Sequence, residues 1–212
     1  RDKRKFSAAV QKLLQRIIRE NSRVIFNGDN YSAEWREEAG RRGLPNAAST
    51  PEALEAMNSK QTYELFAKYG VLSRREAESR FEIYQEKYVK DVMIEARLCL
   101  SMARTMIFPS GVKYQQLLAQ TAAALTTIGK TSCTTTLDEV NSLLARLQKA
   151  MMMLEDVVKM PEGLSHAKQC RYIVGTVIPV MNELRQVADA LEHVCDDEIW
   201  PLPTYQEMLF IR

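Results

Sequence analysis

The stretch SRREAESRFEIYQEKYVKDVMIEARLCLSMARTMIF, residues 73–108, determines the fold that we expect for this chain. Its first four residues, Ser73 to Glu76, form a capping box, in which the serine and glutamate side chains each bond a backbone N–H that the first helical turn leaves unpaired. No helix breaker follows until Pro109, so the stretch predicts a helix of about 35 residues, or about 50 Å. A helix this long needs partners of similar length to be stable.

Three further amphipathic segments supply those partners. They are residues 110–128, a segment that starts at a second capping box, Thr136-Leu137-Asp138-Glu139, and ends near Met160, and residues 165–195. Long helices joined by short loops pack as antiparallel neighbours. Pro109 and Pro179 either kink or end their helices, since both outcomes occur at proline. We predict an all-α fold, an antiparallel bundle of long helices with a short-helix N-terminal segment and an irregular C-terminal tail.

The apolar face of the long helix is expected to point into this bundle. Helical spacing places one set of side chains on that face, broadened by Ile83, Met93 and Leu98. The set is Phe81, Tyr84, Tyr88, Val92, Glu95 and Cys99.

The N-terminal part predicts shorter elements. A helix over residues 3–21 carries an apolar stripe of Phe6, Val10, Leu13, Leu14, Ile17 and Ile18. Val24-Ile25-Phe26 is the only strand-like run, and Asn27-Gly28-Asp29-Asn30 is a turn in which Gly and Asn tolerate positive φ. Ser32 caps a short helix that Gly43 stops. Thr50-Pro51 opens another helix, which is broken near Asn58-Ser59 and ends at Gly70.

We divide the chain into four regions from these patterns. Residues 1–45 are a short-helix N-terminal segment, and residues 46–72 are a short helical connector. Residues 73–195 form the long-helix bundle, and residues 196–212 form the tail.

Composition excludes several classes of partner. The 29 basic and 27 acidic residues leave a net charge of +2, which favours neither nucleic acid nor an anionic membrane. No run of about 18 apolar residues is present, so we expect no membrane span. Four cysteines, Cys99, Cys133, Cys170 and Cys195, lie far apart, which is typical of reduced thiols in a cytoplasmic protein. Residue 1 is Arg rather than Met, which suggests a processed product or a fragment.

Residues that titrate or bind metal are few. The only histidines are His166 and His193, and no zinc-site spacing occurs. His193 lies near Asp196, Asp197 and Glu198, which suggests either a metal or proton site or a solvated helix end, and we favour the helix end. Gly129-Lys130-Thr131 resembles the end of a phosphate-binding loop, but Ala124 stands where that motif needs its first glycine, so we favour a helix C-cap.

Three other groups have both a functional and a structural interpretation. Adjacent residues of Met151-Met152-Met153 point to different faces of a helix, so at least one should reach a second surface. Glu78, Glu82 and Glu86 are interpreted as a charged solvated face rather than a metal site. Tyr31 and Trp35 are interpreted as packing anchors. We therefore predict no catalytic, cofactor-binding or metal-binding residue in this chain.

Four blocks of the sequence resemble the C-terminal third of type III glutamine synthetases. The blocks are residues 24–35 (VIFNGDNYSAEW), Tyr69-Gly70-Val71-Leu72-Ser73, Ala103-Arg104-Thr105-Met106 and residues 200–212 (WPLPTYQEMLFIR). The resemblance implies a parent enzyme that condenses glutamate and ammonia using ATP and divalent Mg or Mn, and that assembles from sister subunits into stacked hexameric rings. It also implies that residues 1–45 pack on an upstream catalytic domain, and that the chain supports this domain and the assembly of the subunits. The motifs of the parent enzyme's active site are not found in residues 1–212, so we expect no cofactor in this chain and expect the chain alone to be inactive.

Two other functions remain as alternatives. In the first alternative, the chain would be a stand-alone helical-bundle module that binds a protein partner through its Met-rich surface. In the second, it would be a nucleotide-binding enzyme that uses Gly129-Lys130-Thr131. A subunit mass well above that of this chain would favour the C-terminal region of a glutamine synthetase. A start codon just upstream of Arg1 would favour the stand-alone module, and ATP binding that depends on Lys130 would favour the nucleotide-binding enzyme.

Overall fold

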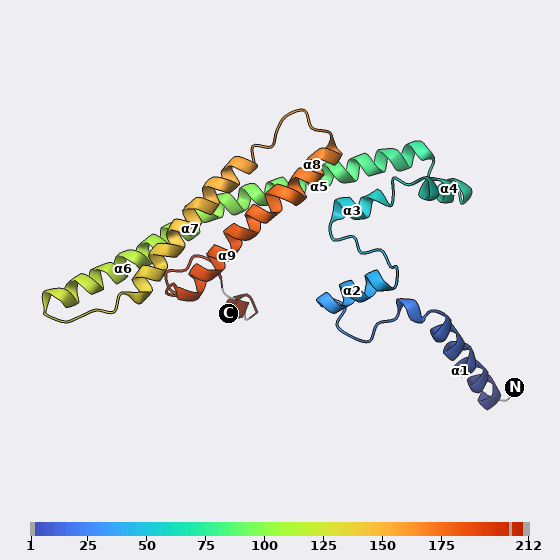
Figure 1. The fold of residues 1–212 in the computed structure, drawn as a ribbon, viewed down its shortest axis with the longest axis horizontal. Coiled ribbons are helices and arrows are strands. Elements are labelled where there is room, and N and C mark those ends of the chain that lie inside the picture. Colours follow the sequence, from blue (N-terminus) through green and yellow to red (C-terminus); the bar gives the residue numbers. More distant parts are fainter. Residues whose placement is uncertain (1–2, 204, 210–212) are drawn as a thin grey trace. The chain divides into compact units, whose positions relative to one another are not determined.

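The structure is a computed structural model and describes residues 3–203 and 205–209 (Figure 1). The described residues form helices and irregular segments without a β-strand, which confirms the all-α prediction. The chain divides into two compact units, residues 1–48 and 49–212. No helix among the described residues is long and apolar enough to cross a membrane.

The first unit contains α1 (Lys3–Glu20), a 3₁₀ turn η1 (Ser22–Val24) and α2 (Ala33–Arg41). The Ser32 side chain accepts a hydrogen bond from the Trp35 N–H at 3.3 Å, and Gly43 has a φ of +67°, so both predicted ends of α2 are confirmed. The strand-like run does not form a strand, because Val24 lies in η1 and the extended Ile25 pairs with no strand among the described residues. Gly28 does not adopt a positive φ, so the predicted reason for that glycine was wrong.

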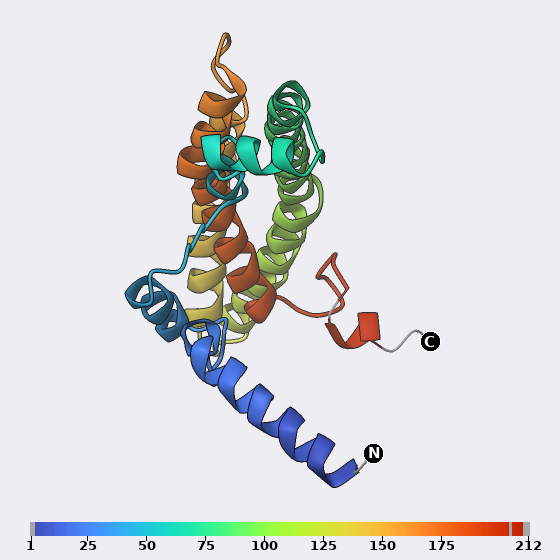
Figure 2. The same ribbon diagram turned by 90° about the vertical axis from the view of Figure 1, so that its right-hand side faces the viewer.

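The second unit opens with two short helices, α3 (Thr50–Glu55) and α4 (Lys60–Lys68). Ser49 and Ser59 cap them, and the break between them lies where Asn58-Ser59 predicted it. In Figure 2, α3 lies across the bundle, and it contacts both α5 and α8. Gly70, with a φ of +62°, follows α4 as predicted.

The longest helix begins at the predicted capping box. The Ser73 N–H donates to Glu76 Oε2 at 2.8 Å, and the Glu76 N–H donates to Ser73 Oγ at 3.3 Å. Three segments then follow without a loop: α5 (Arg74–Met102), the π-helical turn η2 (Ala103–Ile107) and α6 (Phe108–Thr127). The helix therefore continues through Pro109 by way of a π turn.

The return segments are α7 (Thr135–Val157), α8 (His166–Tyr172), the π-helical turn η3 (Ile173–Val177) and α9 (Ile178–Val194). The predicted capping box at Thr136 is wrong, since Thr136 lies inside α7, which begins at Thr135. Its N-cap is Thr134, whose hydroxyl bonds the Asp138 carboxylate at 3.1 Å. Pro179 follows η3 as Pro109 follows η2, and a short helix, α10 (Tyr205–Leu209), lies in the C-terminal tail.

The core of the second unit lies where α7 packs against α5, α6 and α9. Its most buried members include Val140, Leu147, Leu154, Ile173, Val177, Val187 and Leu191. Trp200 joins this core and attaches the start of the tail to the bundle. On α5 the buried face includes Phe81, Met93 and Leu100. Four residues that the sequence assigned to this face are exposed, so the prediction was wrong at Ile83, Tyr84, Glu95 and Leu98.

Candidate functional site

The residues that resemble a phosphate-binding loop form a helix end. Gly129 follows α6 with a φ of +74°, and the Lys130 N–H donates to the Leu125 carbonyl at 2.9 Å. This hydrogen bond is typical of a helix C-terminus at which the residue after the helix adopts the left-handed conformation, and glycine adopts that conformation without steric strain. The backbone N–H of Lys130 is thus used within the helix end and does not cradle an anion.

Each histidine lies within hydrogen-bonding distance of one partner, and Glu78 forms an ion pair. His193 Nδ1 lies 2.6 Å from the Asp189 carbonyl oxygen of its own helix, and His166 Nδ1 lies 3.2 Å from Glu82 Oε2. Glu78 pairs with Arg74 at 2.8 Å. Among the described residues, no group of three His, Cys, Asp or Glu side chains is close enough to hold a metal ion.

The three consecutive methionines separate as helical geometry requires. Met151 is 6% exposed and belongs to the core, whereas Met152 and Met153 are 65% and 44% exposed. Two thioethers therefore face away from the bundle core on α7.

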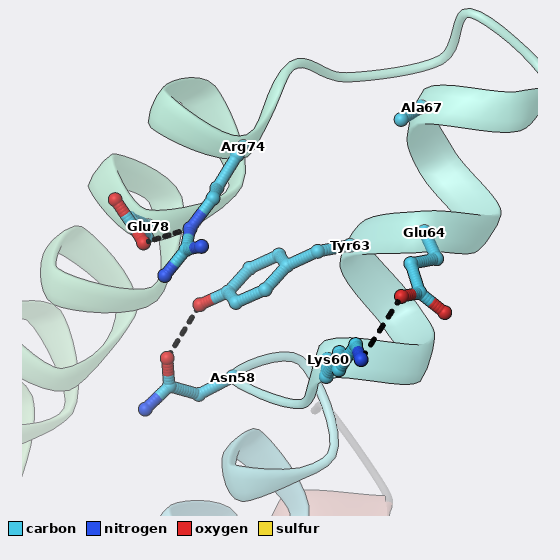
Figure 3. Close-up of a pocket in the computed structure, with 7 residues that line it drawn as sticks. All are labelled: Asn58, Lys60, Tyr63, Glu64, Ala67, Arg74 and Glu78. Atoms are coloured by element: carbon cyan, nitrogen blue, oxygen red, sulfur yellow. Dashed lines mark hydrogen bonds and ion pairs between the residues drawn. The ribbon is translucent and has the colours of Figure 1, made fainter.

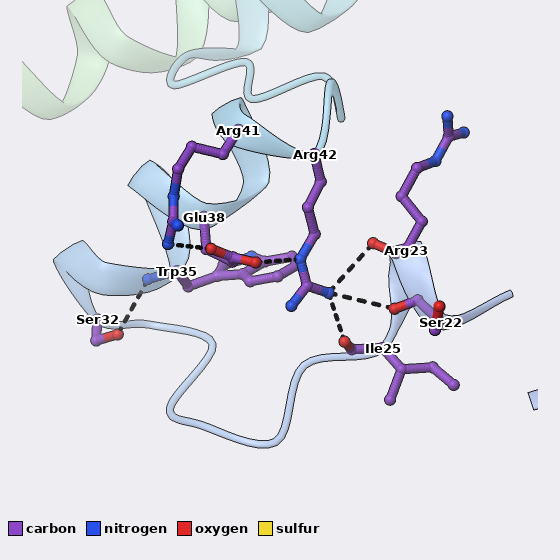
Figure 4. Close-up of polar contacts among 8 residues, drawn as sticks. All are labelled: Ser22, Arg23, Ile25, Ser32, Trp35, Glu38, Arg41 and Arg42. Atoms are coloured by element: carbon purple, nitrogen blue, oxygen red, sulfur yellow. Dashed lines mark hydrogen bonds and ion pairs between the residues drawn. The ribbon is translucent and has the colours of Figure 1, made fainter. Parts of the chain in front are cut away.

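An arginine that carries no distinctive sequence motif organises the first unit (Figure 4). Arg42, just after α2, donates from Nη1 to the carbonyl oxygens of Ser22, Arg23 and Ile25. Its Nε pairs with the Glu38 carboxylate one helical turn earlier. That hydrogen bond and the neighbouring Arg41 hold the pKa of Glu38 below its ordinary value.

Two aromatic rings pack beside the same guanidinium. The Phe26 and Trp35 ring centroids are 4.8 Å apart, and the Arg42 guanidinium carbon lies 6.0 and 5.8 Å from them. A Cβ at Gly28 would lie 2.6 Å from the Phe26 ring, so any other residue at this position would have to displace that ring. Tyr31 is 93% exposed and does not pair with Trp35, which corrects the interpretation of Tyr31 as an anchor.

A polar groove of about 570 Å³ lies between α4 and the start of α5 (Figure 3). The Arg74 guanidinium lies 5.5 Å from the Tyr63 ring centroid, and Lys60 pairs with Glu64. Each cation that lines this groove already has a carboxylate partner. The groove therefore offers no unpaired positive charge to an anionic ligand.

The apolar stripe of α1 is an exposed surface of the first unit that no described residue of this unit covers. Phe6, Val10, Leu13, Leu14, Ile17 and Ile18 are 36–72% exposed. Soluble proteins seldom expose so many large apolar side chains in one contiguous patch unless a partner covers it. This surface is suited to packing, and it carries no chemistry of its own.

Comparison with known proteins identifies a family and several relatives of this chain. Residues 9–126 match the model of the glutamine synthetase C-terminal domain family. The type-3 glutamine synthetase of Dictyostelium discoideum is 33% identical over 96% of this chain. The glutamine synthetases of Butyrivibrio fibrisolvens and Bacteroides fragilis (strain YCH46) are 32% and 30% identical over 95% and 98% of it.

The chain spans only part of these relatives, 29% of the first two and 32% of the third. The family model covers more than half of the 212 residues, and it includes the Arg42 cluster, α5 and nearly all of α6. The chain belongs to the family of glutamine synthetase C-terminal domains.

Proposed function

We propose that this chain is a non-catalytic C-terminal region of a type-3 glutamine synthetase, and that it supports the catalytic domain and the assembly of sister subunits. The parent enzyme would ligate ammonia to glutamate with ATP and Mg or Mn. The observation that carries the proposal is the exposed apolar stripe of α1, together with relatives about three times as long as this chain.

The stripe supports packing of the first region on a larger body. A large apolar side chain contributes about 1.5–3 kcal/mol when it moves from full exposure to full burial. Within the described residues the six side chains of the stripe each keep at least 36% of their surface exposed. The rest of the parent subunit, present in the relatives, is the surface that would cover them.

The regions defined from the sequence take these roles in the proposal. Residues 1–45 pack on the catalytic domain through α1, and residues 46–72 connect them to the bundle. Residues 73–195 form a rigid support, and residues 196–212 a tail attached at Trp200. We expect the parent enzyme in the cytoplasm, as the resemblance implies.

The first test is the mass of the native subunit in a lysate of the source cell, detected with an antibody to this chain. A subunit of about three times 24.2 kDa, found in an assembly that makes glutamine, is the expected result. A product near 24.2 kDa would overturn the proposal and favour a stand-alone interaction module.

A pair of variants in the full-length parent tests the role of α1. Leu14→Asp places a charge in the stripe, whereas Gln15→Asp places the same charge on the polar face of the same helix turn. We expect Leu14→Asp to lower both assembly and activity at least about tenfold, since a buried unpaired charge costs several kcal/mol, and Gln15→Asp to change neither. Equal behaviour of the two variants would remove the packing role.

A further inference from the structure

A second cavity lies within the unit of residues 49–212. Its volume is about 470 Å³, and α5, the π turn η2, α9 and the C-terminal tail line it. Cavities that bind small molecules have volumes of about 300–1,000 Å³ and mostly apolar walls with a few polar groups. This cavity meets both criteria.

The floor of the cavity is apolar. Ala103 and Ile107 of η2 and Leu184 of α9 line it and are all buried. The Cys99 thiol lines it too, and burial raises the pKa of this thiol. The thiol is therefore uncharged at neutral pH and adds a soft, polarisable surface rather than a nucleophile.

The tail supplies the remaining apolar wall. Leu202, Pro203 and Met208 line the cavity together with residues of α9. Trp200, just before them, is held in the bundle core. A molecule in this cavity would therefore contact both the bundle and the tail.

The polar rim lies on α9 and is negative. Arg185, Asp189, Glu192 and His193 line it, and Arg185 Nε is already 3.4 Å from Asp189 Oδ2. His193 Nδ1 lies 2.6 Å from the Asp189 carbonyl oxygen. Glu192 has no ion-pair partner among the described residues. The rim thus favours a cation at the mouth of an apolar cavity.

We propose that this cavity is a binding site for a small amphiphilic cation, with an apolar body between η2, α9 and the tail and an ammonium group near Glu192. The bound molecule holds Leu202, Pro203 and Met208 against α9. The proposal does not depend on the function proposed above. It adds a ligand-dependent contact between the tail and the bundle.

The probe for the test is dansylcadaverine, a fluorescent aromatic body with a primary ammonium. Titration into the 212-residue chain should give saturable binding with a blue-shifted emission. Ala188→Phe, which fills the cavity from α9, should weaken binding at least about tenfold, or about 1.4 kcal/mol. Ala145→Phe, exposed on α7, is the matched control and should bind as the unchanged chain does.

The charge of the probe tests the rim. The same dansyl group carried on aminohexanoic acid has a carboxylate in place of the ammonium, and it should bind at least about tenfold more weakly. Glu192→Gln should remove most of that difference. Equal binding of the two probes, or binding unchanged by Ala188→Phe, would overturn the site. If Ala188→Phe does not fold, as judged by circular dichroism, Met181→Trp fills the same cavity in its place.

Alkylation gives a readout that does not depend on fluorescence. Bound probe should slow the reaction of iodoacetamide with Cys99 several-fold and leave the exposed Cys133 unchanged, as resolved by mass spectrometry of the peptides. Equal slowing at both thiols would mean nonspecific binding and would count against the proposal.

Discussion

Pro109 and Pro179 occupy the same position in two different helices, since each is the second residue after a π-helical turn. Before Pro109, the Phe108 N–H donates to the Ala103 carbonyl five residues back, and Ile178 does the same before Pro179. In a regular helix a proline ring collides with the carbonyl four residues earlier and cannot bond to it. The extra residue of the π turn moves that carbonyl aside, so both helices continue.

Removing the extra residue should therefore be tolerated where the proline is removed with it. Deleting Thr105, which is exposed in η2, together with Pro109→Ala should restore a regular α-helix and keep the buried faces of α5 and α6 in phase. We expect the free energy of unfolding to fall by no more than about 2 kcal/mol. Urea unfolding followed by circular dichroism measures it.

The control is deletion of the exposed Gln148 in the middle of α7, which has no π turn. That deletion rotates all later residues of α7 by about 100° relative to the core. It should abolish the cooperative transition. Similar losses from the two deletions would mean that the π turn does not act as a one-residue insertion.

Alanine substitutions at two glycines of the bundle should change the stability of the unit in opposite directions. A Cβ at Gly111 would lie 2.7 Å from Leu144 Cδ2, and Leu144 is itself buried, whereas a Cβ at Gly175 has no atom within 4 Å. Gly111→Ala should destabilise the unit by about 1–3 kcal/mol through overpacking. Gly175→Ala should stabilise it by about 0.5–1 kcal/mol, because alanine loses less backbone entropy in a helix. Thermal unfolding of the two variants side by side checks both signs.

The helical class and most helix starts could be predicted because their causes are local. Ser32 and Ser73 satisfy N–H groups within three residues of themselves, and Gly43 and Gly70 adopt a positive φ where a helix must end. The fate of the helices at Pro109 and Pro179 could not be predicted. Whether a proline ends a helix depends on whether the carbonyl groups of the preceding turn can bond to other N–H groups, and the sequence does not show this.

Features that depend on contacts between residues distant in the sequence could not be predicted either. Ile83 and Leu98 are apolar but exposed, because a long helix has more apolar positions than its neighbours in the unit cover. The role of Arg42 could not be predicted, because its acceptors are backbone carbonyls 17–20 residues away. Every residue has a backbone carbonyl, so the pattern of side chains does not identify these acceptors.

Arg42 should contribute far more to the first unit than its neighbour Arg41. Arg42→Ala leaves the carbonyls of residues 22, 23 and 25 without their charged donor, and hydrogen bonds to charged groups are worth about 1.5–3 kcal/mol. The Arg41 side chain is 77% exposed and pairs with Glu38, so Arg41→Ala should cost less than about 1 kcal/mol. Hydrogen exchange should show faster exchange across residues 22–30 in Arg42→Ala alone. Equal exchange in the two variants would contradict this role.

The capping box at the start of α5 predicts how acid weakens this helix. Hydrogen bonds from the Ser73 side chain and backbone N–H hold the pKa of Glu76 below its ordinary value of 4.5. A group whose pKa is lower in the folded state stabilises that state above its ordinary pKa, and the contribution disappears as the pH falls through the lowered value. Glu76→Gln keeps an acceptor for the Ser73 N–H but does not titrate. The stability lost as the pH falls below about 5 should therefore be smaller in Glu76→Gln than in the unchanged chain. Urea unfolding from neutral pH downward measures the difference, and parallel curves for the two proteins would show that the box does not respond to pH.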